Sequence, residues 1–218
     1  MRVAALPDVH GFRLPLEAVL AEVERENVDA IVFGGDLFLG PQPAETAELV
    51  RSVDAHFVRG NCDRDSDDWT LSQLDDDTIA WSQGWPLTVE LDGVLYCHAV
   101  PTDDLRPILT DASPDERFAK ALEGVDARFV VAGHTHMQFQ RGRWFNAGSI
   151  GMPYEDDVAA FWALVSDEVE FRRTPFDVER VISEVLATGW PSAETFVAEN
   201  LRVAPSRAEA TAHFESLE

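Results

Sequence analysis

Histidine, aspartate and asparagine recur in short segments that each contain a glycine. These segments are Asp8-Val9-His10-Gly11, Gly35-Asp36, Gly60-Asn61-Cys62-Asp63 and Gly133-His134-Thr135-His136. His98 lies between the last two segments, so the set takes in four of the chain's six histidines. Imidazole nitrogens and carboxylate oxygens suit Mn, Fe, Zn or Ni, and Cys62 is the only soft donor among them. The residue types therefore indicate a site for divalent metal ions.

The spacing within the segments favours paired ligands. Asp8 and His10 are two positions apart, as are His134 and His136. In an extended backbone such pairs point to one side, so we expect each pair to face a single cavity. Glycine accompanies every segment, at positions 11, 35, 60 and 133. These glycines are expected to permit tight turns and close backbone approach.

Alternating strands and helices are expected to position the first three segments. Apolar runs predict strands over residues 2–6, 30–33 and 55–58. Apolar residues with helical spacing predict helices over residues 15–26 and 43–52. Strand–helix–strand units of this length cross over right-handed between parallel strands. Because ligands gather at the carboxyl ends of such strands, the segments are expected to meet at one edge of a sheet.

The rest of the chain is predicted to form further strands and then helices. The aspartate-rich residues 65–77 indicate a solvated loop with a short helix, and a strand pattern begins at residue 78. Further strands are expected at residues 85–91, 94–98, 128–132 and 138–145, and a strand pair over 158–174. Their hairpin turns are expected at Asp92-Gly93 and Ser166-Asp167. Helices are expected at residues 114–122, 177–188, 192–202 and 206–215.

The charge of the chain is strongly negative. Across 218 residues, 40 Asp and Glu oppose 17 Lys and Arg, giving a net charge of −23, and Lys120 is the only lysine. This balance excludes nucleic-acid binding through a general basic face. It is typical of a halophilic cytoplasm, with a GC-rich but ordinary host as the alternative. A thermal stability that did not change with KCl would contradict the halophilic interpretation.

Composition and cysteine content indicate the class of protein and its compartment. The length predicts one domain, or one domain with a small appendage. No apolar run reaches the roughly 18 residues of a membrane span, and the N-terminal residues do not resemble a secretory signal. Two cysteines, Cys62 and Cys97, cannot form a disulfide framework. We therefore expect a cytoplasmic protein that does not bind membranes.

In this order the segments resemble the calcineurin-like metallophosphoesterases, whose pattern is D-x-H, GD, GN-H-[DE], H and GH-x-H. The resemblance covers about residues 1–174. It is closer to the small bacterial and archaeal phosphodiesterase branch, in which the third block is often GNCD and a segment like Asn146-Ala147-Gly148-Ser149 follows the last block. It implies an α/β fold, a four-layer α/β/β/α sandwich of two mixed β-sheets, over residues 1–175. Residues 176–218 are expected to form a C-terminal helical extension packed on this core.

The resemblance also implies a role for each ligand of a dinuclear site, with Asp36 bridging two divalent ions. The other ligands would be Asp8, His10 and His136 for the first ion and Asn61, His98 and His134 for the second. Manganese is the expected metal, with Fe, Ni or Zn as alternatives. A hydroxide between the ions would attack the phosphoester. The implied catalytic residues are Asp36, Asn61, His98 and Cys62.

Cys62 departs from the family pattern, which often has a histidine at this position. That histidine is thought to protonate the leaving group, and a thiol with a pKa of about 8.5 is a poorer acid. We therefore predict a preference for good leaving groups, as in aryl or cyclic diesters. Arg59 and Arg64 are candidate substrate-binding residues, with pairing to surface aspartates as the alternative. His56 and His213 are expected to be ordinary structural or surface residues.

The leading prediction is a dinuclear-metal phosphodiesterase that acts on a small phosphoester. A phosphomonoesterase, a protein phosphatase and a dinucleoside polyphosphate hydrolase would use the same site. A protein-binding scaffold without activity is the alternative from another class, because a eukaryotic trafficking-coat subunit resembles this branch. The complete ligand set favours the enzyme. The extension would either pack on the core or form a homo-oligomer face.

Overall fold

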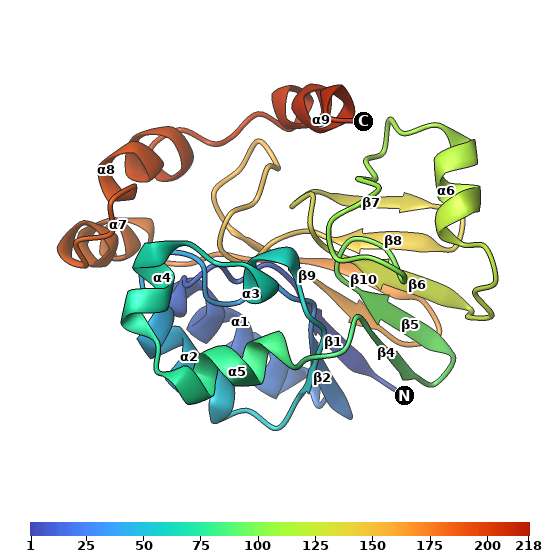
Figure 1. The fold of residues 1–218 in the computed structure, drawn as a ribbon, viewed down its shortest axis with the longest axis horizontal. Helices are drawn as coiled ribbons and strands as arrows, with labels where there is room; N and C mark the ends of the chain where they lie inside the picture. Colours follow the sequence, from blue (N-terminus) through green and yellow to red (C-terminus); the bar gives the residue numbers. More distant parts are fainter.

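Two mixed five-stranded sheets form the centre of the computed structural model, which describes residues 1–218 (Figure 1). The first sheet has the order β10-β9-β1-β2-β3 and the second has the order β4-β5-β6-β8-β7. The first sheet contains β1 (Val3–Leu6), β2 (Ala30–Phe33), β3 (His56–Phe57), β9 (Ala160–Val165) and β10 (Val169–Thr174). The second contains β4 (Thr88–Leu91), β5 (Val94–Cys97), β6 (Phe129–Ala132), β7 (Gln138–Arg141) and β8 (Trp144–Ala147).

The two sheets pack against each other through their inner faces. Val3 and Ala5 of β1 share a buried apolar cluster with Tyr96 of β5 and Val131 of β6. Alternate residues of a strand point to opposite faces, so Ala4 of β1 belongs instead to the cluster on the outer side of the first sheet. Both faces of each sheet are therefore buried.

Helices cover the outer faces of both sheets. On the first sheet, α1 (Arg13–Glu26) and α2 (Pro43–Arg51) contribute side chains to the same apolar cluster as Trp162 of β9. On the second sheet, Phe118 of α6 (Asp115–Ala121) packs edge-on against Trp144, with ring centroids 6.0 Å apart. This order of layers confirms the predicted four-layer α/β/β/α sandwich. The parallel pairing of β1 with β2 and of β2 with β3 is also as predicted.

The strand pattern expected from residue 78 is wrong over its first part. Residues 61–83 form three short helices: α3 (Asn61–Arg64), α4 (Asp68–Gln73) and α5 (Asp76–Gln83). The Asp75 carboxylate caps α5 by accepting a hydrogen bond of 2.7 Å from the Thr78 amide. Trp81 of α5 packs edge-on against Phe57, with ring centroids 5.0 Å apart. Tertiary packing of this aromatic side chain outweighs its local strand preference.

Residues 138–145 also differ from the single strand that was expected. They form most of an antiparallel hairpin of β7 and β8, in which Gln138 pairs with Ala147. Gly142 lies in the turn between the strands with φ +57°, in the left-handed region that glycine adopts at little cost. The expected hairpins between β4 and β5 and between β9 and β10 are both present.

The C-terminal helices pack on the sandwich in two different ways. The helices α7 (Val178–Ala187) and α8 (Ala193–Phe196) and the π-helix η1 (Val197–Leu201) share an apolar cluster with Phe12 and Leu14 at the start of α1. The last helix, α9 (Arg207–Ser216), buries none of its side chains. In Figure 1 it lies apart from α7 and α8, above the loops at the upper edge of the sheets. None of the helices has both the length and the apolar character that crossing a membrane requires.

Candidate metal centre

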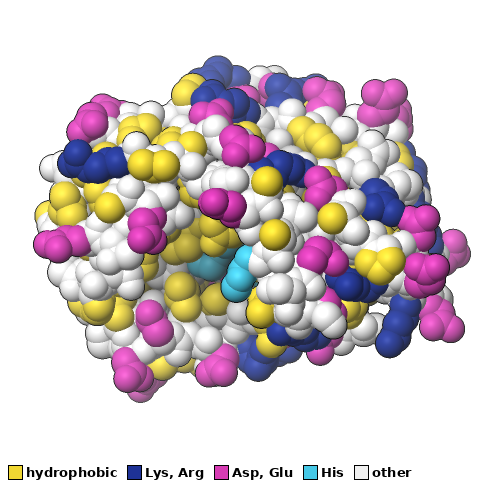
Figure 2. Space-filling model, turned by 90° about the horizontal axis from the view of Figure 1, so that it is seen from above, with side chains coloured by type: hydrophobic (Ala, Val, Ile, Leu, Met, Phe, Trp, Pro, Cys, Tyr) yellow, Lys and Arg dark blue, Asp and Glu magenta, His cyan; other side chains and the backbone are white.

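The predicted ligands lie in the loops that leave the carboxyl ends of five strands. Asp8 and His10 follow β1, Asp36 follows β2, Asn61 follows β3, His98 follows β5, and His134 and His136 follow β6. The strands of the two sheets thus bring residues 126 positions apart in the chain into direct contact, as in the pair His10 and His136. Figure 2 shows a hollow in this face of the molecule, with histidine side chains at its floor and hydrophobic side chains beside them.

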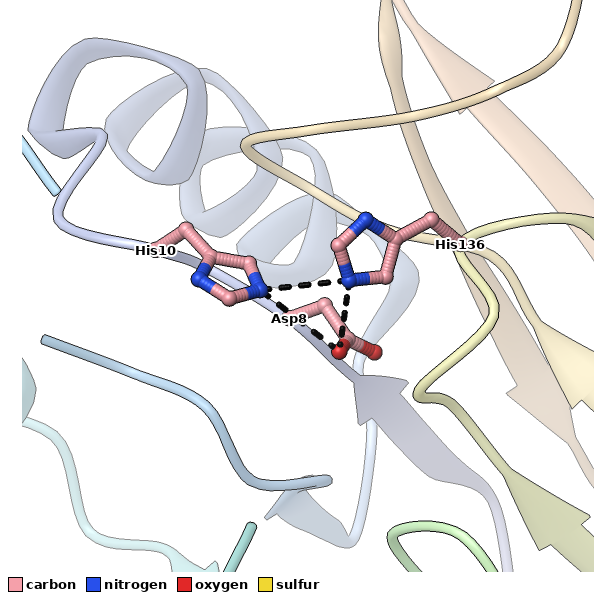
Figure 3. A group of neighbouring side chains, drawn as sticks. All are labelled: Asp8, His10 and His136. Atoms are coloured by element: carbon pink, nitrogen blue, oxygen red, sulfur yellow. Dashed lines mark hydrogen bonds and ion pairs between the residues drawn. The ribbon is translucent and has the colours of Figure 1, made fainter. Parts of the chain in front are cut away.

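Asp8, His10 and His136 form a first cluster, whose side chains point toward one another (Figure 3). The Nε2 atoms of His10 and His136 lie 3.1 Å apart. The Asp8 Oδ1 atom lies 3.1 Å from Nε2 of His136 and 3.8 Å from Nε2 of His10. All three side chains are buried, with relative exposures of 7% or less. One point between them can therefore be reached by two nitrogens and one carboxylate oxygen.

Asp36, His98 and His134 form a second cluster next to the first. The Nε2 atom of His98 lies 3.3 Å from Oδ2 of Asp36. The same Oδ2 atom lies 3.7 Å from Nε2 of His10, which belongs to the first cluster. Asp36 is thus in contact with both clusters and is placed to serve both.

Hydrogen bonds to backbone carbonyls orient three of the four histidines. Nδ1 of His10 faces the Leu39 carbonyl at 3.2 Å, and Nδ1 of His136 faces the Met152 carbonyl at 2.7 Å. Nδ1 of His98 faces the Gly34 carbonyl at 2.8 Å. Because a carbonyl oxygen only accepts, each Nδ1 carries the proton, and in the neutral ring Nε2 then presents its lone pair to the cluster. Metal-binding histidines are commonly held in this way.

Several buried polar atoms of the site have no hydrogen-bond partner in the protein. They are Oδ1 of Asp8, Oδ1 of Asn61, Nε2 of His98 and Nε2 of His134. A buried polar atom left without a partner costs about 1–3 kcal/mol, so such atoms seldom occur together. When the imidazole rings are neutral, all of these atoms carry lone pairs that would bind a cation. The residues therefore fit a pair of divalent cations.

The electrostatics of the site also favour cations. Burial, together with the neighbouring His136, lowers the pKa of His10 to about 4. Burial, together with His98, lowers that of His134 to about 4 as well. For His98 burial acts in the same direction, but the charges of Asp36 and Asp8 outweigh it and raise the pKa to about 10. Against the effect of burial, the His98 charge holds the pKa of Asp36 well below its usual range. The buried carboxylates thus stabilise positive charge beside them.

At five of the ligands the backbone is not extended, so the extended conformation expected for the paired residues is wrong. The φ angles are +52° at Asp8, +50° at His10, +70° at His134 and +58° at His136, and Asp36 has +55°. Residues other than glycine rarely adopt this left-handed region, and each instance stores strain. Asp8 and His10 nevertheless face the same cluster, as expected, whereas the other pair diverges, since His134 joins the second cluster and His136 the first. Such strained positions concentrate at functional sites.

Two glycines leave the space that the carboxylates occupy. A Cβ atom at Gly60 would lie 2.1 Å from Oδ1 of Asp36, and one at Gly133 would lie 2.2 Å from Oδ2 of Asp8. Real contacts of a Cβ atom are never this short. The glycines of the segments therefore act here through close approach of backbone to ligand.

The buried carboxylate of Asp63 holds the loops around the ligands in place. Asp63 accepts hydrogen bonds from the amides of Asp36 at 2.7 Å, Leu37 at 3.0 Å and Gly60 at 2.8 Å. Burial and the charge of Asp36 raise the pKa of Asp63 to about 7, although the hydrogen bonds from these amides lower it. The sequence analysis missed this role, although an acid three residues after Gly60 is the spacing of a helix cap.

The segment after β8 supports the other side of the centre. The Ser149 hydroxyl donates a hydrogen bond of 2.8 Å to the Asp8 carbonyl. The Asn146 amide donates to the Gly133 carbonyl and to the Thr135 hydroxyl. Tyr154 stacks on His136 with ring centroids 5.2 Å apart, a contact that no sequence signal indicated.

The other predicted site residues have different surroundings. Cys62 lies beside the ligands: its amide donates to Asp36 at 2.8 Å, and its Sγ atom accepts from the Asn61 amide at 3.2 Å. Burial and the Asp36 charge raise the pKa of this thiol, so it stays protonated. Arg59 and Arg64 both donate from Nε to the buried carboxylate of Asp104, at 3.2 Å and 3.1 Å. Both arginines therefore pair with an aspartate, as in their alternative role, but this aspartate is buried and does not lie on the surface.

Comparison with known proteins places the fold. The family model described as a calcineurin-like phosphoesterase superfamily domain matches residues 1–167. A metallophosphoesterase from Sphaerobacter thermophilus is 25% identical and covers 91% of this chain and 99% of its own, with a TM-score of 0.76. A hypothetical protein from Pyrococcus horikoshii is 17% identical and covers 90% of this chain and 97% of its own, with a TM-score of 0.73.

A third similar structure is zinc-bound Vps29 from Entamoeba histolytica. It is 18% identical and covers 81% of this chain and 100% of its own, with a TM-score of 0.50. At this identity the likeness extends to the fold alone. No curated protein matches the chain in sequence.

Proposed function

Because this chain belongs to the calcineurin-like phosphoesterase superfamily, we propose that it is a hydrolase that uses two divalent metal ions to cleave phosphodiesters. The observation that carries the proposal is the pair of ligand clusters with Asp36 in contact with both. The first cluster would hold one ion. The second cluster, with Asn61, would hold the other.

Each protein group has a defined task in this proposal. A pair of divalent ions lowers the pKa of water and neutralises charge on phosphoryl oxygens. Asp36 would contribute to holding both ions, and the carbonyl bonds at Nδ1 hold the imidazoles of His10 and His98 in the ligating tautomer. The buried, strained loops leave these ligands little freedom to rearrange, as transition-state stabilisation requires.

Charge favours a diester over a monoester. A phosphodiester carries one negative charge at neutral pH, whereas a phosphate monoester carries about 1.5 to 2. The chain has a net charge of −23, which at low salt repels the more highly charged ester more strongly. The protonated thiol at Cys62 is a weak acid, which favours good leaving groups.

The proposal also includes the metal, the residues that bind the substrate, and the host. Manganese is the proposed metal, with Fe, Ni or Zn as alternatives. Arg59 and Arg64 would meet the substrate phosphate through the guanidinium nitrogens that Asp104 leaves free. The protein would act in the cytoplasm of a halophilic host. The competing function is a protein-binding scaffold, which would retain metal without turnover.

Comparison of two esters in the presence of defined metals tests the proposal. Protein stripped with chelator is resupplied with Mn, Zn, Ni or Mg at low and at molar KCl, and hydrolysis of bis-p-nitrophenyl phosphate and p-nitrophenyl phosphate is followed. We expect metal-dependent cleavage of the diester that falls about 10³-fold in Asp36→Ala. Absence of turnover of both esters, with metal shown to be bound, would overturn the proposal in favour of the scaffold.

A further inference from the structure

A row of aromatic rings leads from the metal centre to the C-terminal helix. Tyr154 stacks on His136 of the first cluster, with ring centroids 5.2 Å apart and an interplanar angle of 14°. The Tyr154 amide also donates to the His136 carbonyl at 3.0 Å, which fixes the two residues together. Phe214 of α9 follows at 6.1 Å from Tyr154, and His213 at 5.8 Å from Phe214. The aromatic surface is thus continuous from a metal ligand to α9.

A cavity of about 430 Å³ opens beside this row of rings. Tyr154, Phe214 and His213 line it together with Asn200 of η1. A volume of this size falls in the range of small-molecule sites. Tyr154 lines the cavity and also stacks on His136, so one side chain separates the cavity from a metal ligand.

The position of α9 is not explained by core packing. None of its side chains is buried, in contrast to those of α7, α8 and η1. Polar contacts hold it instead: Glu215 accepts from Thr110 at 2.6 Å and pairs with Arg117 at 3.1 Å. At its other end Arg207 pairs with Glu155 at 2.7 Å. These contacts keep α9 beside the metal centre, where its contribution is a wall of the cavity.

The chemistry of the lining defines the ligand. Glu199 and Glu209 add negative charge to the cavity, so a phosphate or a carboxylate is repelled from it. The same carboxylates accept hydrogen bonds, as does the Oδ1 atom of Asn200, whose Nδ2 atom donates to the Phe196 carbonyl at 3.3 Å. Aromatic faces with acceptors suit a planar, uncharged ring that carries N–H donors.

We propose that this cavity, closed by α9, binds the nucleobase of a nucleotide phosphodiester whose phosphate lies at the metal centre. The inference rests on the proposed phosphodiesterase and names its class of substrate. The substrate is thus divided between two regions: the sandwich domain takes the phosphate, and the C-terminal extension takes the base.

Two diesters with the same leaving group test the inference. Methyl p-nitrophenyl phosphate has no ring outside the leaving group, whereas the p-nitrophenyl ester of thymidine 5′-phosphate carries a base. We expect kcat/KM to be about tenfold higher for the thymidine ester, as stacking on aromatic side chains predicts. In Phe214→Ala and in Ala210→Phe, which fills the cavity, the ratio should fall toward one. Val203→Ala, exposed and outside the cavity, is the matched control and should retain the ratio.

A binding measurement separates this inference from the proposed function. Saturation-transfer NMR with uncharged thymidine on chelator-treated protein should show contact in the wild type and in Val203→Ala, and none in Ala210→Phe. Equal kcat/KM for both diesters, or thymidine contact unchanged in Ala210→Phe, would overturn the nucleobase site and leave the phosphodiesterase standing. Failure to hydrolyse either diester would contradict the phosphodiesterase, while the NMR result would still decide the site.

Discussion

The metal centre and helix α9 are neighbours, but opposite kinds of interaction hold them. At the centre, Asp8 and His98 are 1% exposed or less, and the backbone of five of the seven ligands is in the strained left-handed region. In α9 no side chain is buried, and the contacts of Arg207 and Glu215 are partly buried ion pairs and hydrogen bonds. The first region depends on close packing and the second on charge.

This difference indicates how the two regions divide the work. Reaction at phosphorus needs ligands that do not move, and the surrounding sandwich supplies the packing that maintains their strain. Recognition of a substituent tolerates a softer wall, which can be altered without disturbing the core. Substitutions in the two regions should therefore differ in size and in kind.

The largest effect is expected where packing meets a ligand. In Gly133→Ala the new Cβ atom would lie 2.2 Å from Oδ2 of Asp8 and would force the carboxylate to move. It would also disturb the hydrogen bond of 3.0 Å that the His134 amide donates to Asp8. A shift of about 1 Å costs about 10²-fold in rate, so we expect a loss of this size in kcat/KM. Initial rates and calorimetric metal titration would measure it.

Gly84→Ala provides the control for this substitution. Gly84 ends α5 with an ordinary φ of −81°, and an added Cβ atom would approach only the carbonyls of Ala80 and Trp81, at 3.3 Å and 3.5 Å. The control should keep its activity and its metal affinity. If Gly133→Ala also kept both, close packing would not be what positions Asp8.

Parts of this centre were predictable from sequence and parts were not. The ligands could be expected to meet because each follows a strand whose apolar run is evident, as at Asp8 and Asp36. Their left-handed backbone could not be expected, since spacing alone does not distinguish it from an extended chain. Asp63 could not be connected to the Asp36 loop either, because its contacts reach across 27 residues and depend on the docking of β2 beside β3.

The fold shows the same limit. Helices such as α1 and α7 have an apolar stripe that local periodicity reveals. In α5, Trp81 and its neighbours have strand propensity, and only their packing against Phe57 in the sandwich selects a helix. The position of α9 depends on polar contacts between residues about 100 positions apart, such as Thr110 and Glu215, which no local pattern encodes.

A smaller effect should sharpen the chemistry assigned to the centre. Burial and the charge of Asp36 raise the pKa of the Cys62 thiol. Cys62→His would replace this thiol by an imidazole, whose ordinary pKa is about 6.5. A better proton donor helps most when the leaving group is poor. We expect kcat/KM to rise about tenfold for diphenyl phosphate and to change little for bis-p-nitrophenyl phosphate. The slope of log kcat/KM against the pKa of the leaving group, measured over a series of aryl diesters, would show this change.

Cys62→Ser serves as the control, because it keeps a small side chain without supplying an acid of suitable pKa. It should show the leaving-group dependence of the wild type. If the leaving-group dependence of Cys62→His equalled that of the wild type and of Cys62→Ser, this position would not contact the leaving group.

The smallest effect is expected at α9, and it should depend on pH. Burial tends to raise the pKa of Glu215, but hydrogen bonds from Ser113 and Thr110 and the charge of Arg117 lower it below its ordinary value of 4.5. A depressed folded-state pKa stabilises the protein above the ordinary value, and this contribution is lost as pH falls through the folded-state pKa. Glu215→Gln should therefore lower the free energy of unfolding by about 1 kcal/mol at neutral pH, and the difference should shrink below pH 4.5.

Denaturant titrations at several pH values would measure this difference, and hydrogen exchange would locate it. Amide protection should fall in α9 and stay unchanged in the strands around the metal centre, because the two regions do not share their stabilising contacts. Glu194→Gln on α8, where the side chain is exposed, should alter neither quantity. If the loss of Glu215 instead lowered protection at the metal centre as well, α9 would belong to the same cooperative unit as the sandwich. The contrast between a packed site and a charge-held wall would then be wrong, and substrate recognition could not vary independently of the reaction.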